Sequence, residues 1–364
     1  MNKLRSLKKS TKVDFATYLG VIVAFVVLTI LGNGGFLTRS LMGQLVPICC
    51  YVVMAISLNL TVGFLGELSL GHAGFMSVGA FSGVIAAMSL QSAIPSTTLR
   101  LIIAVLVGAF FAAIAGTIVG VPVLRLRGDY LAIVTLAFGE IIKEIVNCLL
   151  VGYDSNGLHI AMNFSGNKTI DDLGLTEGGI TIIKGAQGAT GTDKLATFAA
   201  GIVLILIALI IVLNLVHSRS GRAIMALRDN RIAAESVGIN ITKYKLMAFI
   251  TSAALAGAAG ALYGLNFNSL QATKFNFNTS ILVLVFVVLG GLGNIWGSII
   301  AAAILTVLPE LLREFADYRM LVYAIVLILV MLATNSPQVK QYLTKFMSLF
   351  KKKAKNSEGG AIDG

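Results

Sequence analysis

Apolar runs long enough to cross a membrane recur along almost the whole chain. A transmembrane helix needs about 20 predominantly apolar residues, and ten runs come close to that length or exceed it. These runs are residues 13–32, 41–63, 71–90, 100–122, 129–151, 196–216, 245–265, 280–293, 294–312 and 320–335. Only 12% of the residues are charged, against roughly 25% in soluble domains. We therefore predict an all-α, polytopic integral membrane protein with about ten transmembrane helices.

The distribution of basic residues predicts how the chain is oriented. If residues 1–12 form a basic cytoplasmic N-terminus, alternation of the spans places 19 of the 28 Lys and Arg residues on the cytoplasmic side and eight outside. This is the positive-inside pattern. It predicts a transmembrane domain over 13–335 and a cytoplasmic Lys-rich tail over 336–364, with an external loop at 152–194 and a cytoplasmic loop at 217–245. The net charge of +11 therefore indicates membrane topology and contact with lipid headgroups, and no nucleic-acid partner is expected.

Polar residues in or beside the predicted spans are candidates for a translocation path. Glu67 and His72 lie in a stretch rich in small residues, 66–85, and such polar positions are tolerated where they face protein or water. The alternative is a tight helix–helix contact, because Gly79 and Gly83 form a small-x-x-x-small pair. For His72, a buried and hydrogen-bonded histidine is favoured over a proton relay.

A second polar group occupies the fifth predicted span. Glu140, Lys143, Glu144 and Asn147 recur at i, i+3, i+4 and i+7, which places them on one helix face. Charged residues inside a membrane usually face the bundle interior and pair with each other. The group is interpreted either as the lining of a path for a polar or zwitterionic solute or as a structural ion cluster at the outer end of the helix.

Small residues recur every four positions in the span 245–265. Ala256, Gly260 and Gly264 share one face of this helix, and small residues at this spacing allow close helix packing. This face is predicted to be structural, or to mark where a subunit or a moving helix docks.

The loop 217–245 contains a short predicted helix. Asp229 or Asn230 is placed to cap its start, Arg231 and Glu235 are spaced to pair, and Gly238 is placed to end it. A helix of about two turns is not stable alone, so it needs a partner surface. The alternative is an ordinary basic loop that touches lipid headgroups.

Motifs for catalysis are missing from the sequence. There is no G-x-x-x-x-G-K-[ST] phosphate loop and no H-E-x-x-H, and the three histidines are far apart. We therefore expect no catalytic residues, no metal ligands and no cofactor in this chain, which is predicted not to be an enzyme.

Four stretches together resemble the membrane permeases of ABC importers for branched-chain amino acids, and more closely the LivM type than its LivH-type partner. They are GELSLGHAGF at Gly66–Phe75, LRLRGDYLAIVTLAFGEI at Leu124–Ile141, GRAIMALRDNRIAAESVGIN at Gly221–Asn240 and VLGGLGNIWG at Val288–Gly297. The middle two stretches, in this order and spacing, are the most specific. The resemblance covers roughly residues 40–335 and implies a permease bundle of the type II importer kind.

The resemblance implies a transport subunit in a bacterial cell membrane that works with a second permease, two cytoplasmic ABC ATPases and an external substrate-binding protein. ATP and Mg²⁺ would then be bound by the ATPases. The stretch Arg228–Gly238 is similar to the coupling helix of this family, and it contributes Arg228, Asp229, Asn230, Arg231, Ala233, Ala234, Glu235 and Gly238 as coupling residues. Two departures are visible: Ile232 replaces the Glu of the family loop motif, and Glu67 stands where members often have Gln.

Three other functions remain open from the sequence. The same machinery can serve urea, short amides or another amino acid. An ion-coupled secondary transporter would use the intramembrane acids and the glycine break at 290–297 as an ion site. A structural membrane subunit without a path is disfavoured by the intramembrane charges.

Overall fold

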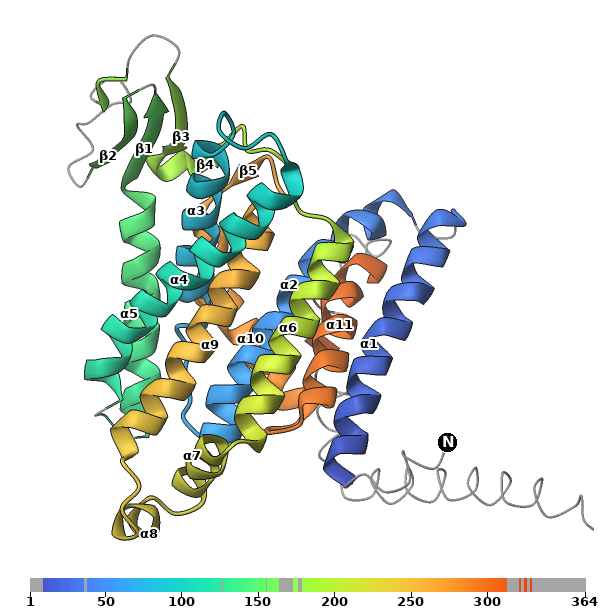
Figure 1. Cartoon of the computed structure of the whole chain (residues 1–364), viewed down its shortest axis with the longest axis vertical. Coiled ribbons are helices and arrows are strands. Elements are labelled where there is room, and N and C mark those ends of the chain that lie inside the picture. The colour runs from blue at the N-terminus through green and yellow to red at the C-terminus, as the bar shows by residue number, and fades with distance from the viewer. Residues whose placement is uncertain are drawn as a thin grey trace, which may run out of the picture. The chain divides into compact units, whose positions relative to one another are not determined.

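Helices make up most of the computed structural model (Figure 1). It describes residues 9–35, 38–124, 126, 128–154, 156–163, 173–175, 179–312, 321, 324, 325 and 328. Most of the predicted basic N-terminus, most of the tenth predicted span and all of the Lys-rich tail lie outside the described residues. The chain forms two units, Met1–Val307 and Leu308–Gly364, and the sites below belong to the first.

The described part of the chain contains eleven α-helices, and a π-helix extends the second. Their bounds are α1 Lys9–Asn33, α2 Arg39–Asn59, π-helix η2 Leu60–Leu65, α3 His72–Ser89, α4 Thr97–Val123, α5 Asp129–Asn147, α6 Phe198–His217, α7 Arg219–Asp229, α8 Arg231–Ser236, α9 Ile241–Gly264, α10 Phe277–Gly290 and α11 Ile295–Leu311. Side-chain caps fix several starts: Thr197, Ser218 and Asn276 accept hydrogen bonds from the backbone three residues on.

Six helical segments among the described residues are long and apolar enough to cross a membrane. They are Arg39–Leu65, His72–Ser89, Thr97–Val123, Phe198–His217, Ile241–Gly264 and Ala272–Gly290. Two more apolar helices, at Thr17–Gly32 and Ile295–Leu311, are shorter. A helical membrane protein is thus confirmed, but the predicted count of ten spans is not. The segment around α5 differs because that helix carries four charged residues and ends at Asn147, before the predicted 151.

The centre of the bundle is a close packing of α3, α4 and α9, in which small residues let the backbones meet. A Cβ at Gly83 would lie 2.6 Å from the Cβ of Ala261, and one at Gly260 would lie 3.0 Å from the Ala80 nitrogen. Gly79 faces the Gly257 backbone, and a Cβ at Gly264 would lie 3.1 Å from the Ala80 carbonyl oxygen. Ala256 is fully buried on α9. These contacts give the small residues a packing function, because any larger side chain would separate the helices.

A five-stranded sheet adds to the helical bundle, which the all-α prediction missed. Its strands are β1 Leu149–Asp154, β2 Gly157–Met162, β3 Ile180–Lys184, β4 Ala189–Thr190 and β5 Ser269–Leu270, in the order β2-β1-β3-β4-β5. All the pairs are antiparallel. Two 3₁₀ turns, Gly185–Gln187 and Ala272–Lys274, lie beside the sheet strands in the sequence. Among the described residues of the predicted external loop 152–194, most therefore belong to a strand or a 3₁₀ turn.

The sheet and the helices α7 and α8 lie at opposite ends of the first unit (Figure 1). We call these the sheet end and the α8 end.

Candidate functional site

Helix α8 is the short helix that the sequence predicted in the loop 217–245. Asn230, and not Asp229, is its N-cap: the Asn230 Oδ1 atom accepts a hydrogen bond from the Ala233 nitrogen at 3.0 Å. Gly238 follows the helix with φ of +83°, and its nitrogen donates to the Glu235 carbonyl at 3.0 Å. A residue with left-handed backbone dihedral angles commonly follows the end of a helix, and glycine adopts this conformation at the least cost.

The outer surface at α8 includes two exposed large apolar side chains. The side chains of Ile232 and Val237 are 81% and 76% exposed, whereas Ala234 is only 4% exposed and faces the protein. Ala233 and Glu235 are also exposed. The exposed Ile232 on α8 and Val237 directly after it form an apolar contact surface.

The predicted ion pair between Arg231 and Glu235 is absent from the described part of the chain. Both side chains extend from a helix of less than two turns, where an exposed pair stabilises little. The helix depends on its two ends and on the buried Ala234 instead.

Arg228 and Asp229 form the last turn of α7. Arg228 donates from Nη1 to the Gly63 carbonyl at 2.9 Å and from Nε and Nη2 to Asp229 Oδ1 at 3.2 and 3.1 Å. Arg228 thus bonds to the π-helix η2, 165 residues away in the sequence. The sequence placed this side chain in the coupling motif and gave no sign of this contact.

Glu67 lies just beyond η2 and forms an ion pair with Lys245 of α9. The Lys245 side chain is 5% exposed and that of Glu67 is 19% exposed. The sequence analysis counted Lys245 among the residues of the loop and missed its contact, since 178 residues separate the two partners. A buried charge with an opposite charge as partner is the expected arrangement in a membrane protein.

His72 is buried at the start of α3. Its Nε2 atom lies 2.7 Å from the Ser57 hydroxyl, and its ring meets Phe75 edge-on at 6.2 Å. Ser57 also donates to the Met54 carbonyl. The surroundings are those of a hydrogen-bonded core histidine.

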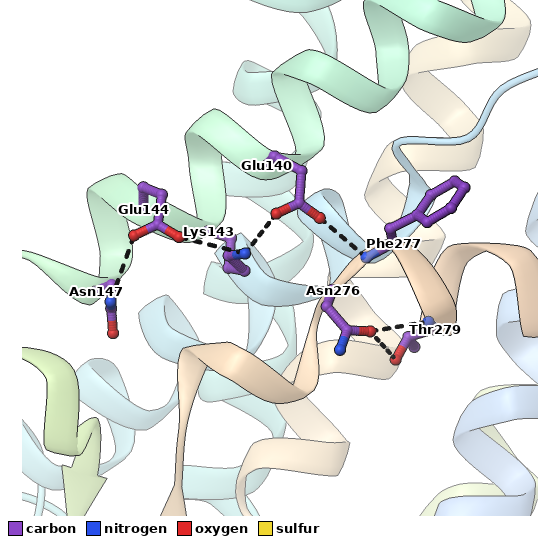
Figure 2. A network of polar contacts seen from close by, with 7 residues as sticks. All are labelled: Glu140, Lys143, Glu144, Asn147, Asn276, Phe277 and Thr279. Atoms are coloured by element: carbon purple, nitrogen blue, oxygen red, sulfur yellow. Dashed lines mark hydrogen bonds and ion pairs between the residues drawn. The ribbon is translucent and has the colours of Figure 1, made fainter.

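The polar residues of α5 form a connected chain at the sheet end, as Figure 2 shows. Lys143 pairs with Glu140 and with Glu144, the second at 3.2 Å. Asn147 donates to Glu144 at 3.4 Å. Glu140 also accepts a hydrogen bond at 2.9 Å from the Phe277 nitrogen, in the first turn of α10, where the helix dipole favours a negative charge.

One buried side chain that the sequence analysis overlooked connects α2 to the turn between α10 and α11. Asn59 is fully buried; its Oδ1 accepts from the Gly293 nitrogen and its Nδ2 donates to the Ser298 hydroxyl, both at 2.9 Å. Asn59 therefore satisfies backbone and side-chain groups at the glycine break. An asparagine inside an apolar run was the available signal.

Metal binding finds no support in the part of the chain that the structure describes, which has no group of three or more His, Cys, Asp or Glu placed to hold an ion. The described acids of α5 are engaged with Lys143 and with backbone.

The chain matches one family of known proteins over most of its length. The family model described as "Branched-chain amino acid transport system / permease component" matches residues 40–331. The chain is 36% identical over 293 residues to the high-affinity branched-chain amino acid transport system permease protein LivM of Salmonella typhimurium, and 33% identical to LivM of Escherichia coli. Each match covers 78% of this chain and 66% of the relative, so the match spans just under two thirds of the length of these relatives.

A more distant relative has another named substrate. The fructose import permease protein FruG of Bifidobacterium longum is 24% identical over 333 residues, which cover 86% of this chain and 88% of FruG. No solved structure matches the chain significantly. The membrane-embedded bundle and the match over residues 40–331 show that the chain belongs to the family of branched-chain amino acid transport permease components, which are not enzymes.

Proposed function

We propose that the chain is the transmembrane permease subunit of an ATP-driven ABC importer for branched-chain amino acids (Leu, Ile and Val), in a bacterial cell membrane. The observation that carries the proposal is the identity of 33–36% to two LivM proteins over 78% of the chain. The 24% identity to a fructose permease makes a sugar the second candidate substrate, and the lower identity ranks it below an amino acid.

We propose that the importer has further subunits: a second permease of the LivH type, two ABC ATPases that bind ATP and Mg²⁺, and an external substrate-binding protein. The permease would form half of the path. The absence of a phosphate-loop motif from the sequence supports ATP hydrolysis by separate chains. The basic loop 217–245 supports a cytoplasmic α8 end and an external sheet end, with both termini cytoplasmic.

The apolar surface of α8 supports docking of the ATPase at that helix. Ile232 and Val237 are the most exposed large apolar side chains on the described part of the loop 217–245, and an exposed apolar patch outside the bilayer marks a protein contact. The buried Ala234 fixes the helix to the permease.

The cluster on α5 supports a place at the outer mouth of the path. It lies at the sheet end and presents an exposed Glu144 beside the paired Lys143. An α-amino acid carries both charges, and a surface with both signs offers each of them a partner. The buried His72 and the partly buried Glu67 are better explained as packing and ion-pair residues.

The substrate is tested by uptake into proteoliposomes that contain the whole importer, with its binding protein and ATP. We expect uptake of radiolabelled leucine and none of fructose. Uptake of fructose alone would reassign the substrate. Leucine uptake by the purified chain alone, driven by an ion gradient without ATP, would show a secondary transporter.

Docking is tested by Ile232→Asp, which places a charge in the proposed contact. We expect the ATPases to be lost from the purified complex by about tenfold or more, because a buried apolar contact is replaced by a charge that is costly to desolvate. The matched control is Thr242→Asp, which adds the same charge at an exposed position in the first turn of α9. Equal recovery of the ATPases with both variants would contradict docking at α8.

A further inference from the structure

Arg228 is turned back into the bundle, although it lies next to α8 in the sequence. Its side chain is 39% exposed, and its guanidinium is held by the Gly63 carbonyl on one side and by Asp229 on the other. A planar guanidinium with bonds in two directions has little freedom. Arg228 is therefore bound within this chain at the position where the family resemblance places an ATPase contact.

The acceptor for Arg228 is a carbonyl that its own helix leaves unpaired. Gly63 lies in the last turn of η2, and the final carbonyls of a helix have no donor within it. The π-helix itself is a rare form that is frequent at functional sites. A hydrogen bond from a charged donor to this carbonyl is stronger than one between neutral groups.

The space for the Arg228 side chain is provided by Gly66. Gly66 ends η2 with φ of +78°, in the region that favours glycine. A Cβ on Gly66 would lie 2.6 Å from Arg228 Cγ. Position 66 thus needs glycine both for the backbone conformation and for the contact with Arg228.

The end of η2 and Arg228 also contact the turn between α10 and α11. A Cβ at Gly63 would lie 2.9 Å from Gly293 Cα, and one at Gly293 would lie 3.7 Å from Arg228 Nη1. Asn59 holds Gly293 and Ser298 from the other side. We call the group Asn59, Gly63, Gly66, Arg228 and Gly293 the α7 junction, because it brings α2, α10 and α11 to the end of α7.

Helix α7 connects this junction rigidly to the bundle and to α8. Ile224 and Leu227 of α7 are buried, and only Asn230 separates the end of α7 from the first residue of α8. A packed helix transmits a displacement because it does not deform continuously. A force on α8 thus reaches α2, α10 and α11 at Arg228.

We propose that Arg228 is a positioning residue that transmits the movement of α8 to the π-helix and the α10–α11 turn, and that it makes no contact with the ATPase. The proposal rests on the proposed function, since α8 is taken as the docking helix. It predicts that loss of Arg228 separates ATP hydrolysis from transport. A docking residue would instead lose the ATPase itself.

The test uses the complete importer in proteoliposomes with Arg228→Gln, and measures ATPase recovery, ATP hydrolysis and leucine uptake. We expect recovery and hydrolysis within twofold of the parent and uptake lowered by about tenfold or more, the loss for one hydrogen bond to a charged group. Arg228→Lys keeps one donor and should restore part of the uptake. Arg219→Gln is the matched control, because Arg219 is the exposed first residue of α7 and has no ion pair among the described residues.

Gly66→Ala gives an independent test, since it displaces Arg228 without changing any charge. It should reproduce the separation of hydrolysis from uptake. If Arg228→Gln does not assemble, Arg228→Lys decides: the proposal predicts hydrolysis with reduced uptake. Two results would overturn the proposal. If ATPase recovery and uptake fall together in the assembled variants, Arg228 belongs to the docking surface. If uptake is unchanged, Arg228 does not transmit the movement of α8.

Failure of this proposal is distinct from failure of the proposed function. If the parent importer takes up leucine and Ile232→Asp removes the ATPases, the proposed function stands whatever Arg228 does. If the parent neither binds ATPases nor takes up leucine, the proposed function fails first.

Discussion

Replacement of Glu67 gives the most direct measure of how a buried charge is held at the α8 end. Lys245 is 5% exposed and Glu67 is 19% exposed, and each is the other's ion-pair partner in the described part of the chain. Glu67→Met leaves the Lys245 ammonium buried without a counter-charge. Removing one partner of a buried ion pair costs about 3–5 kcal/mol, and the small exposure of Lys245 leaves little water to reduce that cost.

The other members of the mutant cycle should cost less. Glu67→Gln keeps an acceptor for Lys245 but removes the charge, so its cost lies below that of Glu67→Met. Lys245→Met leaves the more exposed Glu67 unpaired, for which about 1–2 kcal/mol is expected. The double variant Glu67→Met with Lys245→Met removes both charges and should be close to the parent, because an apolar pair of similar volume often replaces a buried ion pair at little cost.

The free energy of unfolding is measured by SDS titration in mixed micelles. Trp296 is the only tryptophan in the chain, so its fluorescence gives one probe and far-UV circular dichroism a second, and coincident transitions would justify a two-state treatment. Each 1.4 kcal/mol changes the unfolding equilibrium tenfold. Glu235→Gln, at an exposed position of α8, is the control and should be neutral. Stability unchanged by Glu67→Met, or a double variant as unstable as Glu67→Met, would refute the reasoning.

Two further predictions concern the α5 cluster and the α3–α4–α9 packing. Lys143→Met leaves Glu140 and Glu144 without their cation. Because these partly exposed ion pairs stabilise the fold little, we expect normal amounts of the complex and reduced leucine uptake. Replacement of the exposed Lys194 by Met is the control, and unchanged uptake by Lys143→Met would make the cluster purely structural. Gly257→Leu should abolish recovery of monodisperse protein in size-exclusion chromatography, because a Cβ there would lie 2.6 Å from the Gly108 carbonyl. Gly43→Leu should be tolerated, because an added Cβ there would meet no packed neighbour within 4 Å. Equal recovery of both variants would contradict close packing of α4 and α9.

Features that depend on local sequence were predictable. The apolar runs located the helices, and the cap and the glycine at either end of α8 located that helix to within a residue or two. The sheet was missed although Asn156–Gly157 lies between two apolar stretches, which is a hairpin signal. The run 129–151 hid the boundary, because the apolar residues of β1 continue directly from those of α5.

Contacts between distant residues were beyond the reach of sequence reasoning. The pairing of Glu67 with Lys245, and of Arg228 with Gly63, joins segments more than 150 residues apart. The spacing of residues within one helix carries no information about their partners on other segments of the chain. The charge of Glu67 acquires a physical reason only once Lys245 is seen beside it.

The α7 junction brings together residues from three of the four stretches that carry the family resemblance. Gly66 opens the first of the four stretches, Arg228 lies in the third and Gly293 in the fourth, and all three meet at the end of η2. A π-helix is rare and occurs mostly as a single turn, frequently at functional sites. Here the Gly63 carbonyl in its last turn accepts a hydrogen bond from Arg228, and the adjoining glycine turn is held by Asn59. Because the groups of the α7 junction are in contact with one another, a change at any one of them should displace α2, α7 and the α10–α11 turn together. Transmission of movement from α8 requires this coupling.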